Sequence, residues 1–228
     1  MLFRSGYVVN PAQVERQIAV LNEAYAGRSS TQTAPTVFQF VTRSVNYIRN
    51  SDWYEWDLPG ATPENPTPDP DDAEAKTALH QGGYDDLNIY VASLSDQVLG
   101  YATFPWLTKL PLDGVVLLNQ SLPGGTASGY NEGDTATHEV GHWLGLAHTF
   151  ENGCTEPGDW VDDTPYQADG PNIFTCRESD DTCAQPGLDP VHNYMSYGDD
   201  PCLDRFTAGQ SARMTLIWLA YRANVTLT

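Results

Sequence analysis

Basic residues are scarce in this 228-residue chain: 11 lysines and arginines stand against 30 aspartates and glutamates, and the formal net charge is −19. A nucleic-acid-binding protein needs a basic face to neutralise phosphates, so we expect no nucleic-acid partner. The chain also lacks an apolar run long enough to cross a bilayer, and we expect no membrane partner. Internal repeats are absent as well. The length suits one well-buried domain with a cleft.

Features of a signal peptide are also scarce at the start of the sequence, where residues Met1 to Arg4 lack the basic and apolar regions of such a leader. The chain nevertheless contains four cysteines, which favour an oxidising compartment. We therefore expect a mature secreted domain, cut from a precursor whose signal and pro-segment are not in this sequence. A cytosolic protein with free thiols is the alternative.

The cysteines all lie in the last third of the chain, at Cys154, Cys176, Cys183 and Cys202. Glycine, proline and aspartate dominate this region, so it builds little apolar core and needs cross-links. Four cysteines allow three pairings, and the sequence alone does not choose among them. A structural zinc held by four thiolates is a competing interpretation, although the spacing lacks paired CxxC elements.

Three of the five histidines fall within the segment HEVGHWLGLAH, residues 138–148. On a helix, His138 and His142 lie on one face and can both reach one tetrahedral zinc ion. A continuous helix would carry His148 about 15 Å further along its axis than His138. The chain must therefore turn back, and Gly145 can end the helix in the left-handed conformation.

Glu139 would lie beside the metal rather than on it. Zinc lowers the pKa of a bound water to about 7, and a neighbouring carboxylate can take its proton and pass it to a leaving amine. Three protein ligands leave a fourth position for water and substrate, which distinguishes catalytic from structural zinc. The core HExxH pattern also occurs by chance on amphipathic helices, so the downstream elements matter.

The next such element is the segment NYMSY, residues 193–197. With it the chain resembles the metzincin clan of zinc endopeptidases, in which HExxHxxGxxH is followed by a methionine turn beneath the metal. The residue after the third histidine distinguishes the families of this clan, and Thr149 at this position resembles the pappalysin family. Further matches are LNIY at 87–90, LGYA at 99–102, DGVV at 113–116, LPGG at 122–125, TAT at 135–137 and DTP at 163–165. The resemblance runs from about Leu87 to Met214 and is strongest to the short secreted bacterial, archaeal and fungal members.

The resemblance implies that the three histidines bind zinc and that Glu139 is the general base and acid. It places Met195 as an apolar floor beneath the histidines. It also implies that the Tyr197 phenol donates a hydrogen bond to the developing oxyanion, a role in which a positioned donor contributes several kcal/mol. A buried packing tyrosine is the alternative for Tyr197.

The resemblance also favours interleaved disulfides, Cys154–Cys183 and Cys176–Cys202. It implies protein or peptide substrates, and we expect the missing pro-segment to act as an inhibitor in the precursor.

A group of hard oxygen ligands lies between the zinc motif and the methionine turn, at Asp159, Asp162, Asp163 and Thr164. Related family members bind calcium near this segment. Calcium takes roughly six to eight oxygens, so these side chains would supply part of its shell. We expect a structural calcium here; the alternative is a solvated acidic loop.

Substrate peptides in the clan pair antiparallel with the edge strand of the sheet. Val115, Val116 and Leu117 are the candidates for this edge because they shortly precede the zinc motif; an interior strand is the alternative. Asp199 and Asp200 follow the methionine turn, and in some bacterial and archaeal relatives an aspartate there selects arginine or lysine just beyond the scissile bond. By this resemblance Asp200 is the candidate, pairing with such a side chain through a charge-assisted hydrogen bond. If both aspartates point to solvent or calcium, specificity should be apolar.

The expected element order is a helix over 11–26, a strand over 36–48, a surface excursion over 58–72, a helix over 72–80, strands over 87–92 and 115–119, a helix over 135–147 and a helix over 208–221. This order predicts an α+β fold. With the resemblance, it predicts a metzincin-like two-lobed catalytic domain: a twisted mixed sheet with long helices in the N-terminal lobe, and an irregular disulfide-stapled C-terminal lobe. We expect a single domain over 1–228, with subdomains 1–145 and 146–228.

The sequence therefore predicts a secreted zinc-dependent endopeptidase that hydrolyses peptide bonds through a zinc-bound water, with Glu139 as general base and acid. It is expected to favour Arg or Lys on the carboxyl side of the scissile bond. A zinc hydrolase of a non-peptide amide and a non-catalytic binding module are the alternatives, and a non-catalytic relic would have no need of Glu139.

Overall fold

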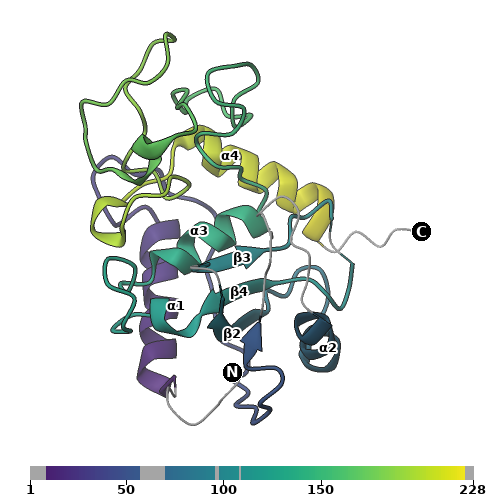
Figure 1. Cartoon of the computed structure of the whole chain (residues 1–228). Coiled ribbons are helices and arrows are strands. Elements are labelled where there is room, and N and C mark those ends of the chain that lie inside the picture. Colours follow the sequence, from purple (N-terminus) through teal and green to yellow (C-terminus); the bar gives the residue numbers. More distant parts are fainter. Residues whose placement is uncertain (1–8, 57–69, 96–97, 108, 224–228) are drawn as a thin grey trace.

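The computed structural model describes residues 9–56, 70–95, 98–107 and 109–223 (Figure 1). Its helices are α1 (Pro11–Tyr25), α2 (Pro70–Leu79), α3 (Asp134–Trp143) and α4 (Ala208–Ile217), and α4 continues as a π-helical turn over Trp218–Arg222. Its strands are β1 (Glu55–Trp56), β2 (Ile89–Leu94), β3 (Gly100–Ala102) and β4 (Val115–Leu118). Short 3-10 turns cover Asn119–Ser121, Pro171–Phe174 and Asp200–Cys202. None of the described helices is long and apolar enough to cross a membrane.

Helix α1 begins where the sequence supplies a cap. The Asn10 side chain accepts a hydrogen bond from the Gln13 backbone N–H, and the Gln13 side chain accepts one from the Asn10 N–H. This reciprocal capping box satisfies two of the N–H groups that a helix start leaves unpaired. At the other end of α1, the Tyr25 hydroxyl donates to the Thr137 carbonyl at 3.0 Å. Helix α1 thus braces α3.

The sheet has the strand order β1-β2-β4-β3. The pairs β1–β2 and β2–β4 are parallel, and β3 runs antiparallel to β4. Val115 and Leu117 face the core under α1 and α3, whereas Val116 faces a second core that includes Ala75 of α2. Figure 1 shows α1 and α3 beside the sheet and α2 set apart from them. Burial on both faces explains why β4 is a continuous apolar run.

The prediction that Val115, Val116 and Leu117 form the sheet edge was wrong. Strand β4 pairs with β2 on one side and with β3 on the other, so it is interior. The edge next to α3 is the short strand β3, which precedes β4 in the sequence but lies outside it in space. Strand β4 is thus close to the zinc motif in the sequence but does not form the edge of the sheet.

The predicted strand over 36–48 was also wrong, because residues 36–47 belong to no described strand. Phe38 and Phe40 pack on the core while Val37 and Val41 are exposed, which produces the alternation seen in the sequence. The Asn22 amide satisfies the backbone N–H and carbonyl of Phe40, at 2.8 and 2.9 Å. A cavity of about 730 Å³ separates this extended segment from β2, and none of the three histidines lines it.

Other expected elements are present with shifted ends. The predicted helix over 72–80 is α2, the strand over 87–92 is β2, and the helix over 208–221 is α4 with its π-helical turn. Most of the predicted excursion over 58–72 lies outside the described residues. The short strands β1 and β3 were not predicted.

Apart from an isolated β-bridge between Asn193 and Arg205, residues 144–207 contain turns, short 3-10 segments and irregular chain, and they form the loops at the top of Figure 1. The disulfides join Cys154 to Cys183 and Cys176 to Cys202, the pairing that the family resemblance implied. Helix α4 then returns to the N-terminal part, where the Trp218 and Trp143 rings lie 5.9 Å apart. The division into subdomains 1–145 and 146–228 stays a prediction.

Candidate metal centre

Helix α3 begins without a side-chain cap of its own. Its N-cap is Gly133, in the left-handed region at φ 110°. The Asp200 carboxylate supplies the missing acceptor: its Oδ2 receives the backbone N–H groups of Glu132, Gly133 and Asp134 at 2.7, 3.0 and 3.4 Å. An anion at this position also interacts favourably with the helix dipole. Asp200 therefore fixes the start of the helix that carries the first two histidines.

The end of α3 is set by Gly145, which adopts φ 95° as the break in the motif predicted. A Cβ at this position would also lie 2.6 Å from the side chain of Ile217 in α4. Only glycine suits both the left-handed backbone and the close approach of α4. The turn that follows brings His148 back to the face of the helix.

The three histidines converge on one point. The Nε2 atoms of His138, His142 and His148 are separated by 3.0, 3.1 and 3.2 Å. All three side chains are buried. Tetrahedral zinc with ordinary Zn–N bonds places its ligand nitrogens about 3.3 Å apart, so this triangle has the size of a zinc site.

Second contacts fix the ring orientation of two of these histidines. The Nδ1 atom of His138 lies 2.7 Å from the Tyr194 carbonyl oxygen, and the Nδ1 atom of His142 lies 2.7 Å from the Leu146 carbonyl oxygen. Carbonyl oxygens only accept, so each Nδ1 carries the proton and each Nε2 presents its lone pair to the centre. Burial, with His142 nearby, lowers the pKa of His138 to about 3, so this ring is neutral, as a metal ligand must be.

Glu139 is buried beside the three rings, with 6 % of its surface exposed. Its Oε2 atom has no hydrogen-bond partner among the described residues. Burial raises the pKa of Glu139 to about 8, and a divalent cation next to it would lower that value. A Cβ on Gly100 of strand β3 would lie 2.9 Å from Glu139 Cγ. Glu139 is therefore held by close packing under the edge strand.

Met195 is fully buried beneath the motif. Its sulfur occupies the position that a Cβ on Gly141 would need, which explains the glycine inside HEVGH. The Asn193 side chain accepts the Met195 N–H at 2.9 Å, and the Met195 carbonyl accepts the Thr149 N–H at 3.1 Å. These bonds join the methionine turn to the residue that follows the third histidine.

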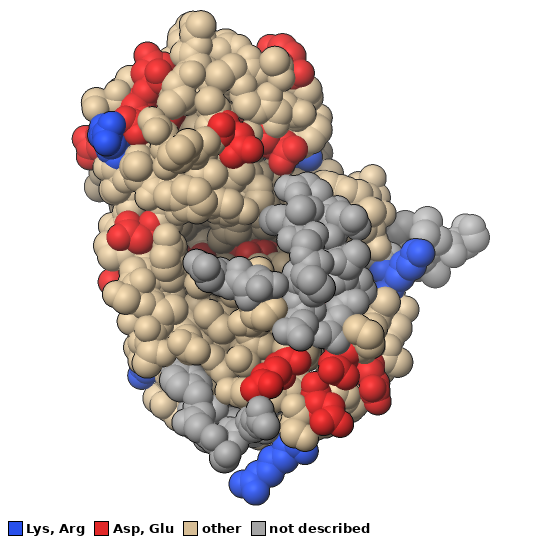
Figure 2. Space-filling model, viewed as in Figure 1, with Lys and Arg blue, Asp and Glu red and all other residues tan. Residues whose placement is uncertain are grey.

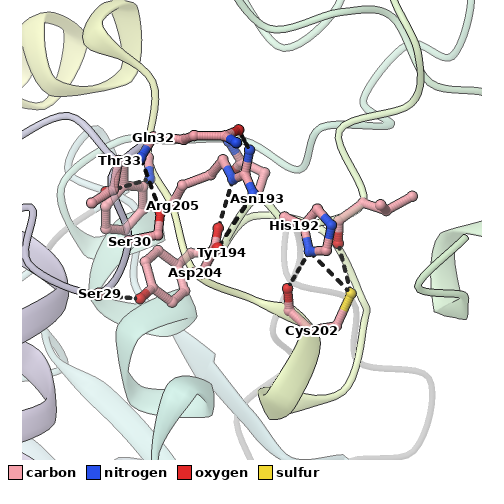
Figure 3. A network of polar contacts seen from close by, with 12 residues as sticks. Ser29, Ser30, Gln32, Thr33, His192, Asn193, Tyr194, Cys202, Asp204 and Arg205 are labelled. Atoms are coloured by element: carbon pink, nitrogen blue, oxygen red, sulfur yellow. Dashed lines mark hydrogen bonds and ion pairs between the residues drawn. The ribbon is translucent and has the colours of Figure 1, made fainter. Parts of the chain in front are cut away.

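A polar network holds the same turn from the other side (Figure 3). The Tyr194 hydroxyl donates to Ser29 Oγ at 2.7 Å, and Arg205 donates to the Gln32 side chain. The Tyr194 N–H donates to the Arg205 carbonyl at 3.0 Å. The loop after α1 is thereby tied to the residue whose carbonyl orients His138.

Tyr197 belongs to an aromatic cluster around the third histidine. Its ring lies 4.7 Å from His148 and 5.7 Å from His138. Phe150 stacks on His148 at 4.7 Å, and Phe150 and Phe174 lie 4.9 and 5.6 Å from Tyr197. Sequence reasoning missed both phenylalanines, because isolated aromatic residues in irregular segments carry no periodic signal.

The predicted calcium residues do not converge as a group of carboxylates. Asp159 and Thr164 are buried, whereas Asp162 and Asp163 are exposed, and Asp163 accepts the Gly209 N–H at 2.8 Å. Within the described ranges, the histidine triad and the group Cys176, His192 and Cys202 are the sets of three or more candidate ligands within 4.8 Å. The cysteines of the second group are disulfide-bonded to each other, so it is no metal site.

Figure 2 shows a hollow between the C-terminal loops and the sheet-bearing part, with acidic atoms visible inside it. Few basic side chains appear on this face. The arrangement of a buried histidine triad and an adjacent carboxylate is suited to hydrolysis at a metal ion.

The sequence and the fold were compared with those of known proteins. The profile of peptidase family M43, described as pregnancy-associated plasma protein-A, matches residues 77–218. An extracellular metalloprotease of Neurospora crassa is 40% identical over 228 residues, covering 97% of this chain and 72% of the relative. One of Colletotrichum graminicola is 43% identical over 227 residues, covering 96% and 73%.

Solved structures agree with the sequence matches. Mature mirolysin of Tannerella forsythia, in complex with a cleaved peptide, superposes with a TM-score of 0.74 and 28% identity, covering 95% of this chain and 88% of that chain. A promirolysin mutant of the same organism gives a TM-score of 0.75 and 26% identity, covering 95% and 77%.

Proposed function

The chain belongs to the M43 family of peptidases, the pappalysins, and on this basis we propose that it is an endopeptidase that cleaves extended stretches of protein chains. It is a zinc metalloprotease, and like its fungal relatives it is extracellular. The promirolysin match favours a precursor in which a pro-segment covers the site.

One observation carries the proposal: three buried Nε2 atoms lie 3.0 to 3.2 Å apart, and two of the rings are oriented by backbone carbonyls. Zinc bound there would polarise the scissile carbonyl and activate a water as nucleophile. Side chains of the protein would carry out the proton transfer and bind the oxyanion.

Glu139 would take the proton of the attacking water and deliver it to the leaving amine nitrogen. Its position next to His138, its burial and its unpartnered Oε2 support this role. Tyr197 would donate its hydroxyl proton in a hydrogen bond to the developing oxyanion. Its ring contacts with His138 and His148 support a location within reach of the reacting carbonyl.

The substrate backbone would pair with β3. This strand is antiparallel to β4, and no described strand lies on its other side. An extended peptide can therefore add to the sheet here through main-chain hydrogen bonds. Gly100 of β3 lies against Glu139, so a peptide on this edge passes directly over the proposed base.

Beyond the scissile bond we propose a preference for Arg or Lys, with Asp200 as the anion. Three backbone N–H groups hold its Oδ2, and no described residue donates a hydrogen bond to Oδ1. Asp200 is buried and Asp199 is exposed, which favours Asp200 for the base of a pocket. A buried carboxylate would pair with a guanidinium or ammonium group of the substrate.

The ratio of kcat/KM for an Arg peptide to that for the matched Leu peptide tests this preference. Asp200→Asn should bring the ratio toward one, and Asp199→Asn should leave it high. Because the ratio cancels a general loss of activity, damage to the start of α3 does not imitate the effect. An unchanged ratio in Asp200→Asn would show that Asp200 does not select the Arg side chain.

We also propose a structural calcium near Asp159. Its buried Oδ2 and the buried Thr164 Oγ1 have no hydrogen-bond partner of good geometry, although the Thr164 hydroxyl lies close enough to lower the pKa of the Asp159 carboxyl. Burial outweighs that contact and raises this pKa to about 7. Backbone carbonyls would have to complete the shell. Added calcium should raise the melting temperature of the zinc-loaded wild type but not of Asp159→Asn; equal responses would contradict the site.

The activity itself is tested with a diverse peptide library, read by mass spectrometry, with and without a zinc chelator. Internal cuts that disappear with the chelator and return with added zinc are expected. If zinc-loaded, disulfide-bonded protein cuts no peptide, the endopeptidase proposal fails in favour of a small-amide hydrolase or a binding module.

A further inference from the structure

Phe174 is an apolar side chain left open to solvent close to the metal centre. It is 60% exposed, and its ring lies 5.6 Å from Tyr197, which in turn lies 4.7 Å from His148. A single exposed apolar residue is ordinary on a protein surface. This one differs because a single ring separates it from a histidine of the triad.

The backbone beneath Phe174 is firmly anchored. The preceding residue, Ile173, is buried, and its carbonyl accepts the hydroxyl of Ser196, which follows Met195 in the methionine turn, at 3.5 Å. Two residues after Phe174, Cys176 forms its disulfide with Cys202. The backbone that carries the ring is therefore held in place before any substrate arrives, which reduces the conformational entropy lost on binding.

We propose that Phe174 is a substrate-binding residue of this peptidase, and the inference rests on the proposed function. Its ring packs against one bulky apolar side chain of the bound peptide, within three residues of the scissile bond. An extended peptide advances about 3.3 Å per residue, so three residues span about 10 Å. A peptide side chain within that distance of the scissile bond can reach the Phe174 ring, which lies next to Tyr197. Burying both apolar surfaces against each other removes them from water.

This contact adds a second, apolar preference to the charged one proposed for Asp200. The two features lie at opposite ends of segment 197–200. Phe174 packs against Tyr197 at one end, and Asp200 at the other end accepts a backbone N–H group at the start of α3. They are therefore expected to recognise different positions of the peptide.

A purely supporting role would give a different result. If Phe174 only held Tyr197 in place, its loss would slow every substrate by the same factor, mainly through kcat. A binding role affects only peptides with a bulky apolar residue at one position, mainly through KM.

The test compares wild type, Phe174→Ser and Phe174→Leu on peptides in which each of the three residues on either side of the cut is in turn Leu, Phe or Ala. At one position Phe174→Ser should lower kcat/KM for the Leu and Phe peptides about tenfold, which corresponds to about 1.4 kcal/mol. The Ala peptide should be unaffected, and Phe174→Leu should keep most of the preference.

Equal losses on all peptides, or no loss on any, would overturn the inference while the wild type still cleaves. A zinc-loaded wild type that cleaves none of these peptides would overturn the proposed function as well, so the two failures are distinguishable. Phe174 is exposed, so Phe174→Ser should keep the wild-type melting temperature, which controls for misfolding.

Discussion

Glycines, which have no side chain to take part in the reaction, set the geometry of the catalytic groups. Gly141 leaves room for the Met195 sulfur, Gly145 turns the chain back toward His148, and Gly100 lets β3 lie on Glu139. The contacts of Gly141 with Met195 and of Gly100 with Glu139 are long-range, and no local pattern would have ranked these two glycines above the others. Gly145 differs, because the spacing of the histidines already requires a turn there.

Gly100→Ala should therefore damage catalysis without damaging zinc binding. The added Cβ would lie 2.9 Å from Glu139 Cγ and 2.9 Å from the Val116 carbonyl oxygen, so the base or the edge strand must move. A misplacement of about 1 Å can cost on the order of 100-fold in rate. We expect kcat/KM to fall 10- to 100-fold at unchanged zinc content.

The matched control is Gly170→Ala, where a Cβ would meet nothing within 4 Å. This variant should keep wild-type activity. If Gly100→Ala is as active as Gly170→Ala, close packing does not position Glu139.

The ligand set was predictable at the residue scale because its information is local. His138 and His142 share a helix face, and Gly145 explains how His148 returns. Phe150 and Phe174 were not predictable, since their contacts with Tyr197 depend on how the irregular segments fold back.

At the scale of elements, helix α3 depends on a partner far away in the sequence. Asp200 supplies the acceptor at its start, and Asp134 in its first turn lies near that carboxylate. Burial, followed by the charge of Asp200, raises the pKa of Asp134 to about 8. The folded state therefore keeps a proton on Asp134 that the unfolded chain has lost above its ordinary pKa.

Asp134→Asn should consequently change stability in a pH-dependent way. The folded-state pKa is raised, so the wild type loses stability as pH rises from about 4 to about 8, whereas an amide does not titrate. The melting temperature of Asp134→Asn should exceed that of the wild type by a larger margin near pH 9 than near pH 5. An amide that destabilises equally at both pH values would mean that Asp134 is ionised in the folded protein throughout.

Helices were easier to predict than strands. The pattern of α1 and the cap at Asn10 lie within a few residues of each other, so the sequence contains them directly. Strand order is different, because β3 lies outside β4 although it precedes it in the chain. The alternation of buried and exposed side chains between Phe38 and Val41 likewise comes from burial on one side of an extended segment that pairs with no strand.

At the scale of the whole molecule, the last described turn connects to the sheet-bearing part. Arg222 forms a buried ion pair with Asp113 at 2.8 Å and donates to the Trp143 carbonyl at 2.7 Å. The Trp143 indole N–H donates to the same Asp113 carboxylate at 3.0 Å. The end of α3 is therefore fixed to the chain that follows α4.

Breaking this pair from one side should destabilise the protein strongly. Arg222→Met leaves the buried Asp113 charge without its guanidinium partner, which costs about 3–5 kcal/mol in the free energy of unfolding. Denaturant unfolding measures the loss. The double variant Asp113→Asn with Arg222→Met should recover a large part of it; a double variant no more stable than the single one would show that the buried charge is not the cause.

The α+β class followed from the order of the elements, whereas the disulfide pairing required the family resemblance. Three pairings were compatible with the spacing, and the fold of residues 144–207 decides between them by bringing Cys154 to Cys183 and Cys176 to Cys202. That fold has little regular structure, so no periodic pattern encodes it.

We propose that the histidine triad holds zinc while Glu139 moves the proton. The most direct measurement is zinc content and peptide cleavage, determined side by side for the wild type and Glu139→Gln. We expect one zinc ion per chain in both proteins, with kcat lowered by about a thousandfold or more in Glu139→Gln. A Glu139→Gln protein that cleaves like the wild type, or a wild type that cleaves without zinc, would contradict it.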